Sequence, residues 1–330
     1  MKIVFLGSPE FAVVCLKKLL ETNHQVVGVV SQPDRPVGRG NKLTPTPVKE
    51  FAQANNLPVF TFEKISRDGI ETLKNLKPDI MVTVAYGQIL SKQVLEIAPH
   101  GTINVHASLL PKYRGASPIQ SAIINGEQFT GVTIMHTDLG LDDGDILSYR
   151  QVEILPEDTA GALGEKLSVV GSELLVGTLE DIENGSVQRV KQNSSDATFT
   201  TKLSKNDCII NWHKSATQIK NLIMGSNPDP IASTTLNGSV VKIYTASVIS
   251  KEENPDLWQV LEQNKGAEVG QILKGSSPKA GVFVLCSNRV LKLGLVQLPG
   301  GKVLPAESLL AGRKLNVGDV FKYIHGVNIN

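Results

Sequence analysis

Residues 2–31 read KIVFLGSPEFAVVCLKKLLETNHQVVGVVS, and this opening indicates the architecture of the chain. Residues 2–7 form a continuous apolar run, as a parallel strand does when both faces of its sheet are buried. Residues 11–21 have helical spacing and follow Pro9, which suits the start of a helix. Residues 25–31 are a second apolar run. This β-α-β order predicts an α/β fold with a doubly wound, mostly parallel sheet.

Helix-like and strand-like segments go on alternating as far as residue 184. The sequence predicts helices over residues 48–55, 67–75, 94–98, 118–125 and 159–184. It predicts strands over residues 58–61, 78–84, 103–106, 131–136 and 146–154. The turn after the first strand reads GSPE at residues 7–10 and lacks the G-x-G-x-x-G pattern, so we do not expect a dinucleotide site.

The length of 330 residues favours two domains over one. A polar segment follows the last predicted helix, and after it come a helix over 215–224 and several short strands. The strands are separated by Gly, Pro and Asn, which is typical of a small OB-like β-barrel. The predicted division is a Rossmann-like α/β domain over 1–188, a linker over 189–205 and a β-barrel domain over 206–330.

Composition and charge narrow the class of protein. Apolar residues make up 41% and charged residues 20% of the chain, as in soluble globular proteins. Residues 1–199 carry 18 basic and 23 acidic side chains, whereas residues 200–330 carry 15 and 9. This asymmetry suggests a polyanionic partner for the second part.

The cysteines and the apolar runs bear on where the protein works. Cys15, Cys208 and Cys286 are far apart, which fits a reducing compartment and excludes a zinc ribbon. The N-terminal apolar run is too short for a signal peptide, and no run is long enough to cross a bilayer. We therefore expect a cytoplasmic protein without membrane contact.

Residues 102–118, TINVHASLLPKYRGASP, contain the first candidate site. Asn104 and His106 are two apart on a predicted strand, so their side chains leave the same face. Polar residues at the carboxyl end of a strand lie where open α/β sheets bind ligands. A pair of hydrogen-bonded structural residues is the alternative, and the pair alone does not decide between the two.

A second segment, TDLGLDDGD at residues 137–145, has four acidic residues and two glycines. A carboxylate from this loop could reach His106 and orient its ring, which favours catalysis. A solvated acidic loop and a calcium site are the alternatives. The spacing of the acids does not match an EF-hand loop, so calcium is disfavoured.

The segment over residues 32–49, QPDRPVGRGNKLTPTPVK, is basic and contains four prolines. We predict a long loop here, because the prolines exclude a helix or a central strand. The pattern G-x-x-x-x-G-K-[ST] is absent, so an NTPase phosphate loop is not expected. The loop either contacts phosphates or is a solvated surface loop, and the sequence leaves both open.

Taken together, the motifs resemble the signature of the folate-dependent formyltransferases. The resemblance rests on Asn104-x-His106, on the SLLP run at residues 108–111 and on the GLDDG run at residues 140–144. The opening GSPEFA, the PDIMVTVAYG segment and the KLSK…I-W pattern at residues 202–212 also fit, so the resemblance extends from Met1 into the predicted barrel.

The resemblance implies an activity, with roles for particular residues. A formyl group would pass from 10-formyltetrahydrofolate to the α-amine of methionine on initiator tRNA, for translation initiation. It further implies that no metal is needed and that the C-terminal barrel binds tRNA, and we expect a monomer. The implied residues are Asn104, His106 and Asp142 for catalysis, Ser108, Leu109, Leu110 and Pro111 for folate, and Arg39 and Lys42 for tRNA.

Alternatives to this function remain within and outside the family. A formyltransferase of the same core could act on an amino sugar nucleotide or a glycinamide ribonucleotide, and a hydrolase could release formate. A non-catalytic RNA-binding protein is the third alternative, against which the intact catalytic residues speak. The basic segment and the long second domain favour a tRNA acceptor. The GSNPDP run at residues 225–230 lacks the aromatic residues that the family usually shows there.

Overall fold

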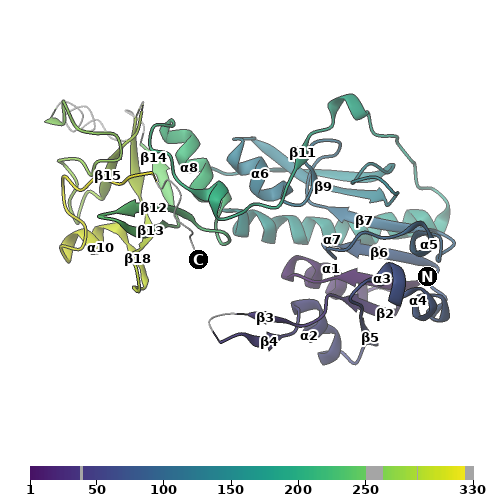
Figure 1. Ribbon diagram of the computed structural model, residues 1–330. Coiled ribbons are helices and arrows are strands. Elements are labelled where there is room, and N and C mark those ends of the chain that lie inside the picture. Colours follow the sequence, from purple (N-terminus) through teal and green to yellow (C-terminus); the bar gives the residue numbers. More distant parts are fainter. Residues whose placement is uncertain (38–39, 250–262, 288, 324–330) are drawn as a thin grey trace. The chain divides into compact units, whose positions relative to one another are not determined.

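The computed structural model describes residues 1–37, 40–249, 263–287 and 289–323 (Figure 1). The chain divides into two compact units. The first consists of Met1–Pro118, Phe129–Glu153 and Gly164–Thr200, and the second of Ile119–Gln128, Ile154–Leu163 and Thr201–Asn330. The domain boundaries at residues 188 and 206 stay a prediction.

A seven-stranded sheet forms the centre of the first unit (Figure 1). Its order is β10 (Ile146–Glu153), β9 (Phe129–His136), β7 (Thr102–His106), β6 (Ile80–Val84), β1 (Lys2–Gly7), β2 (Gln25–Ser31) and β5 (Val59–Thr61). Neighbours from β7 to β5 are parallel, whereas β9 runs antiparallel to β7 and β10 antiparallel to β9. The predicted mostly parallel sheet is confirmed.

The order of the strands locates a switch point in the sheet. From β1 the chain moves outward to β2 and β5, and then returns to the other side of β1 to form β6. In open α/β sheets, ligands bind outside the carboxyl ends of the strands at such a point. Strand β7 lies next to β6, which brings the candidate residues Asn104 and His106 close to this edge.

The helices of the first unit bury one face each, as their apolar spacing requires. In α1, the buried residues Ala12, Cys15, Leu16 and Leu19 form a single stripe. The helix predicted over 67–75 is two short helices instead. The elements are α1 (Glu10–Leu20), α2 (Pro47–Ala54), α3 (Ile65–Asp68), α4 (Ile70–Leu76), α5 (Lys92–Leu95) and α7 (Ala160–Asn184), of which α7 begins in the second unit.

Helix α7 packs closely against the sheet at a glycine. A Cβ atom at Gly171 would crowd the side chains of Val105 on β7 and Val132 on β9. The glycine therefore lets the helix backbone approach the two strands. This contact covers one face of β7. The candidate residues Asn104 and His106 lie at the carboxyl end of the same strand.

Two short pieces of the basic segment over residues 32–49 are strands. Strands β3 (Arg35–Val37) and β4 (Lys42–Thr44) form a two-stranded antiparallel ribbon, so the expectation of a plain loop is wrong. Prolines are tolerated in an isolated ribbon because each strand has a free edge. At the base of the ribbon Lys49 Nζ lies 2.7 Å from Asp34 Oδ1.

The second unit contains antiparallel strands, as predicted. One sheet has the order β12 (Ala232–Leu236), β13 (Ser239–Ile243), β17 (Leu295–Gln297) and β18 (Val303–Pro305). The other has the order β14 (Ala246–Val248), β16 (Val290–Leu293) and β15 (Val282–Leu285). The helical elements are α6 (Pro118–Ile124), the 3-10 turn η2 (Asn206–Cys208), α8 (Ala216–Gly225) and α10 (Ala306–Ala311).

A stacked aromatic pair lies in the core of the second unit. The rings of Trp212 and Phe321 stack at 5.5 Å between centroids, and Trp212 Nε1 donates to Thr234 Oγ1 at 2.9 Å. The buried indole thus satisfies its one polar atom. The sequence predicts strands here over residues 240–247, 269–273, 281–286 and 290–296. Residues 269–273 form only isolated bridges instead, and β12 and β18 were not predicted.

Candidate active site

Strand β7 presents Asn104 and His106 from one face at its carboxyl end. The side chain of His106 is 6% exposed, and Asn104 is half-buried. The flanking residues Ile103 and Val105 are buried and fix the strand in the sheet. The alternation that predicted this strand therefore also sets the direction of both polar side chains.

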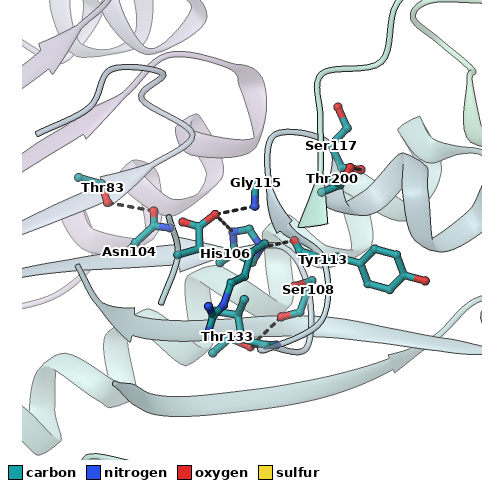
Figure 2. Close-up of polar contacts among 12 residues, drawn as sticks. Thr83, Asn104, His106, Ser108, Tyr113, Gly115, Ser117, Thr133 and Thr200 are labelled. Carbon is teal, nitrogen blue, oxygen red and sulfur yellow. Dashed lines mark hydrogen bonds and ion pairs between the residues drawn. The ribbon is translucent and has the colours of Figure 1, made fainter. Parts of the chain in front are cut away.

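The ring of His106 lies between two acceptors (Figure 2). Its Nε2 atom is 3.0 Å from the carbonyl oxygen of Tyr113, and its Nδ1 atom is 3.6 Å from Asp142 Oδ2. The second distance is that of an ion pair and is longer than a hydrogen bond. The structure thus brings together the imidazole and the carboxylate that the sequence singled out, although 36 positions separate them in the chain.

Asp142 projects from the loop between β9 and β10. Its backbone φ is 48°, in the left-handed region. The carboxylate oxygen Oδ2 also accepts a hydrogen bond of 2.8 Å from the backbone nitrogen of Gly115. A Cβ atom at Gly144 would collide with the carbonyl oxygen of His136, so the loop needs glycine there. One oxygen of Asp142 is therefore held by a backbone donor while it faces His106.

Thr83 orients the amide of Asn104 (Figure 2). The two residues are opposite each other on β6 and β7, and Thr83 Oγ1 donates to Asn104 Oδ1 at 2.9 Å. Because the amide oxygen is engaged, the Nδ2 group points away from Thr83. Sequence reasoning missed Thr83, although it is the one polar residue in the buried run IMVTV over residues 80–84 and so carried a signal.

The loop over residues 108–111 is held by hydrogen bonds of its own. Ser108 is fully buried, and its hydroxyl donates to the carbonyl oxygen of Lys112 at 2.7 Å. Thr133 Oγ1 donates to the carbonyl oxygen of Ser108 at 2.7 Å and accepts a hydrogen bond of 3.2 Å from the backbone nitrogen of Leu110. The side chain of Ser108 thus shapes the loop. Leu110 is also buried, whereas Leu109 and Pro111 are half-buried.

The other side of this loop pairs with a segment that sequence reasoning treated only as a linker. Strand β8 (Arg114–Gly115) pairs in parallel with β11 (Phe199–Thr200), after the 3-10 turn η1 (Ser194–Asp196). The nitrogen of Tyr113 donates to Thr198 Oγ1 at 2.8 Å. The carbonyl that faces His106 belongs to Tyr113, so the segment after α7 supports the candidate site directly.

Of the two residues predicted to contact tRNA, the structure describes one. Lys42 begins β4, is exposed and lies opposite Val37 in the ribbon. Arg39 lies outside the described residues.

Burial sets the protonation state of the three cysteine thiols. It raises the pKa of Cys15, Cys208 and Cys286 to about 12, so these thiols remain protonated near neutral pH and are poor nucleophiles. Within the described ranges, no group of three or more His, Cys, Asp or Glu side chains could hold a metal ion. The helices of the same ranges include none with the length and apolar character to span a membrane.

Two family models match the chain in sequence. The model described as Formyl transferase matches residues 1–179. The model described as Formyl transferase, C-terminal domain, matches residues 202–314. Together they cover both compact units in part.

Curated relatives match nearly the whole chain. The methionyl-tRNA formyltransferase of Clostridium novyi is 44% identical over 324 residues, which cover 98% of this chain and 100% of the relative. The methionyl-tRNA formyltransferase of Alkaliphilus oremlandii is 42% identical over 321 residues, which cover 97% and 99%.

Solved structures of lower identity share the fold. The N-formyltransferase from Helicobacter canadensis, in complex with folinic acid and dTDP-3-aminofucose, has a TM-score of 0.62 at 20% identity, over 92% of this chain and 100% of that one. HypX from Aquifex aeolicus, in complex with tetrahydrofolic acid, has a TM-score of 0.63 at 16% identity, over 96% of this chain and 48% of that one. At such identities the likeness establishes only the fold. The full-length relatives and the two matching models establish more, and the chain belongs to the formyl transferase family, among the methionyl-tRNA formyltransferases.

Proposed function

We propose that this protein transfers a formyl group from 10-formyltetrahydrofolate to the α-amine of methionine on initiator tRNA, and that Asn104, His106 and Asp142 carry the reaction. The observation behind the proposal is the approach of Asp142 to His106 at the end of β7, the strand that also bears Asn104. The names of the relatives support the acceptor, and the tetrahydrofolic acid bound by HypX supports a folate donor.

Asn104 would stabilise the charge that develops on the formyl oxygen. The bound folate supplies a formyl carbon that an amine can attack. Because Thr83 occupies Oδ1 of Asn104, its Nδ2 donors are free to face the oxygen on which negative charge gathers. A fixed donor of this kind is worth about 10²–10³ in kcat. The half-buried Leu109 and Pro111 of the loop over residues 108–111 would contact the folate through their apolar side chains.

His106 and Asp142 would move the proton. As the new C–N bond forms, the attacking amine loses a proton, which the Asp142 carboxylate can accept directly or through a water molecule. His106, beside that carboxylate, can return a proton to N10 of the folate as the old C–N bond breaks. The proton lost by one nitrogen is thus gained by the other. Positioned proton transfer typically contributes about 10²–10⁴ in rate.

Basic surfaces would hold the tRNA. Residues 200–330 carry 15 basic and 9 acidic side chains, and the ribbon of β3 and β4 adds Arg35 and Lys42. Such groups bind phosphates and make affinity depend on salt. Arg39, next to this ribbon in sequence, remains a proposed contact. We further expect a cytoplasmic monomer that needs no metal ion.

One assay tests the proposed reaction. Purified protein is incubated with 10-formyltetrahydrofolate and either initiator or elongator methionyl-tRNA, and formylmethionine is measured on the tRNA. We expect product with the initiator tRNA. An amino sugar nucleotide as the preferred acceptor, or formate release without transfer, would each overturn the proposed acceptor.

The role of His106 has its own test. The variant His106→Ala should lower the rate by at least about 10²-fold, because it removes the group that moves the proton. Binding of tRNA, measured by filter retention, should change little. The variant His100→Ala replaces an exposed histidine six positions earlier and is the matched control. Turnover of His106→Ala close to that of the control would refute the catalytic role.

A further inference from the structure

The loop that carries Asp142 is held from its backbone side by a glutamine. Gln192 Nε2 lies 2.8 Å from the carbonyl oxygen of Asp142 and 2.8 Å from that of Gly144. The two carbonyls are two positions apart, and the first belongs to the residue with the left-handed backbone. The amide of Gln192 therefore bridges the turn at the point where the Asp142 side chain leaves it.

A buried arginine fixes the orientation of that amide. Arg114 is 5% exposed, and its Nε and Nη2 atoms donate to Gln192 Oε1 at 3.0 and 2.8 Å. A guanidinium can only donate and a backbone carbonyl can only accept. The two ends of the Gln192 amide are therefore distinguished by their partners, and a flipped amide would face both partners with the wrong atoms.

The same short strand that supplies Arg114 also holds the carboxylate. Gly115, the next residue, donates its backbone N–H to Asp142 Oδ2 at 2.8 Å. Strand β8 is fixed in turn by β11, since Arg114 N donates to Thr198 O at 2.8 Å and Ala116 N to Thr200 O at 3.1 Å. A Cβ atom at Gly115 would collide with the carbonyl oxygen of Thr200, so this approach requires glycine.

We propose that Gln192 and Arg114 are positioning residues for the formyl transfer, which place the Asp142 carboxylate next to His106. The proposal rests on the proposed role of Asp142. Two adjacent residues of β8 hold Asp142 at two points. Gly115 donates to its carboxylate, and Arg114 orients the Gln192 amide that donates to its backbone carbonyl. The segment after α7 thereby belongs to the catalytic apparatus, although its residues do not contact the reacting atoms.

The variant Gln192→Glu separates positioning from packing. Glutamate keeps the length of the side chain and an acceptor for Arg114, but it turns an oxygen instead of N–H donors towards the two loop carbonyls. We expect kcat to fall about 10–100-fold, since a misplaced catalytic group can lower the rate about 10²-fold. The KM for methionyl-tRNA and the midpoint of thermal unfolding should stay close to those of the wild type.

Two further variants complete this comparison. Gln188→Glu makes the same chemical change at an exposed position of the same segment and should behave as the wild type. Gln192→Met removes the donors without adding charge, so it serves if Gln192→Glu does not fold, and it should lower kcat in the same way. Wild-type kcat in either folded Gln192 variant would overturn the proposal.

A double-mutant cycle tests whether Gln192 acts through Asp142. Single-turnover rates are compared for Asp142→Asn, Gln192→Glu and the double variant. If the glutamine acts through the carboxylate, Gln192→Glu should lower the rate of Asp142→Asn by less than about 2-fold, within the usual error of additivity. Losses that multiply in the double variant would overturn the proposal.

The same data distinguish the two hypotheses. Wild-type turnover in Asp142→Asn would refute the proposed role of Asp142, and the positioning role of Gln192 with it. A large loss in Asp142→Asn together with wild-type turnover in Gln192→Glu would overturn only the positioning role.

Discussion

At the scale of single residues, the candidate site depends on two side chains, Asn104 and His106, in each of which one polar atom already contacts a neighbouring residue. Thr83 occupies the oxygen of Asn104, and the carbonyl of Tyr113 faces Nε2 of His106. The other polar atom of each side chain, Nδ2 of Asn104 and Nδ1 of His106, therefore points in a different direction. A pre-oriented donor needs no reorganisation as charge develops, which is the physical basis of its effect on rate.

The donor role of Asn104 can be tested with a nearly isosteric change. Asn104→Asp keeps an oxygen for the Thr83 hydroxyl but replaces the Nδ2 donors with a carboxylate oxygen. We expect kcat for formyl transfer to fall by about 10²–10³, as for the loss of an oxyanion donor. Asn56→Asp, at an exposed turn, is the control, and equal kcat for the two variants would argue against the proposed role.

His136 should make stability depend on pH. Burial, and next the charge of Arg189, lower the pKa of His136 below its usual value of 6.5. The unfolded chain then binds more protons than the folded one below about pH 6.5, so stability is present above this pH and is lost as pH falls towards the folded pKa.

The measurement is urea unfolding at several pH values. We expect the free energy of unfolding to fall as pH is lowered from about 7.5 to about 5.5, and the fall to be smaller in His136→Gln. The exposed His100→Gln is the control. An identical pH slope in His136→Gln and the wild type would exclude this contribution.

At the scale of elements, short pieces of backbone do much of the positioning. The two-residue strands β8 and β11 support the loop beside His106, and the ribbon of β3 and β4 presents the basic segment. Short ribbons are marginal on their own, so they rely on the domain to which they are attached. The ribbon is attached through Asp34 and Lys49, which form an ion pair at its base.

The ribbon should contribute to tRNA affinity through charge. Lys42→Ala should weaken the binding of initiator tRNA, and the slope of log K against log salt should become shallower by about 1 if one phosphate contact is lost. The control is Lys92→Ala, whose side chain is 70% exposed on α5. An unchanged slope in Lys42→Ala would show that this residue does not touch a phosphate.

At the scale of the whole molecule, the division of labour between the two parts can be tested by truncation. A chain that ends after Asn193 would lose β11 and with it the pairing of β8. A chain of residues 1–200 keeps both strands together with Asn104, His106 and Asp142. The second cut is therefore the better test.

We expect the chain of residues 1–200 to bind a folate analogue with nearly the affinity of the full chain and to lose most of its affinity for tRNA, since it lacks the basic second part. Calorimetry with the folate and filter binding with the tRNA measure the two affinities. Binding of tRNA as tight as that of the full chain would contradict the inference from the charge asymmetry.

Much of the fold and part of the site could be read in advance. Buried parallel strands are continuous apolar runs, so β1, β2 and β6 were visible in the sequence. Asn104 and His106 stood out because they end such a run and the acidic loop over residues 137–145 follows another, whereas Asp142 within that loop was implied only by the family resemblance. The ribbon was missed because both strands are short and β3 contains Pro36, and β12 because its residues, ASTTL, lack a strong apolar pattern.

The residue types at the candidate reaction centre and the order of most helices and strands are local properties, and the amino-acid sequence was enough to predict them. The support of that centre is not local. Thr83 binds Asn104 over a sequence separation of 21 positions, and Gln192 binds the Asp142 loop over 50. Strand β11 pairs with β8 over 85 positions. Such hydrogen bonds leave no periodic trace in sequence, because each requires only one polar atom at a place that the folded chain supplies.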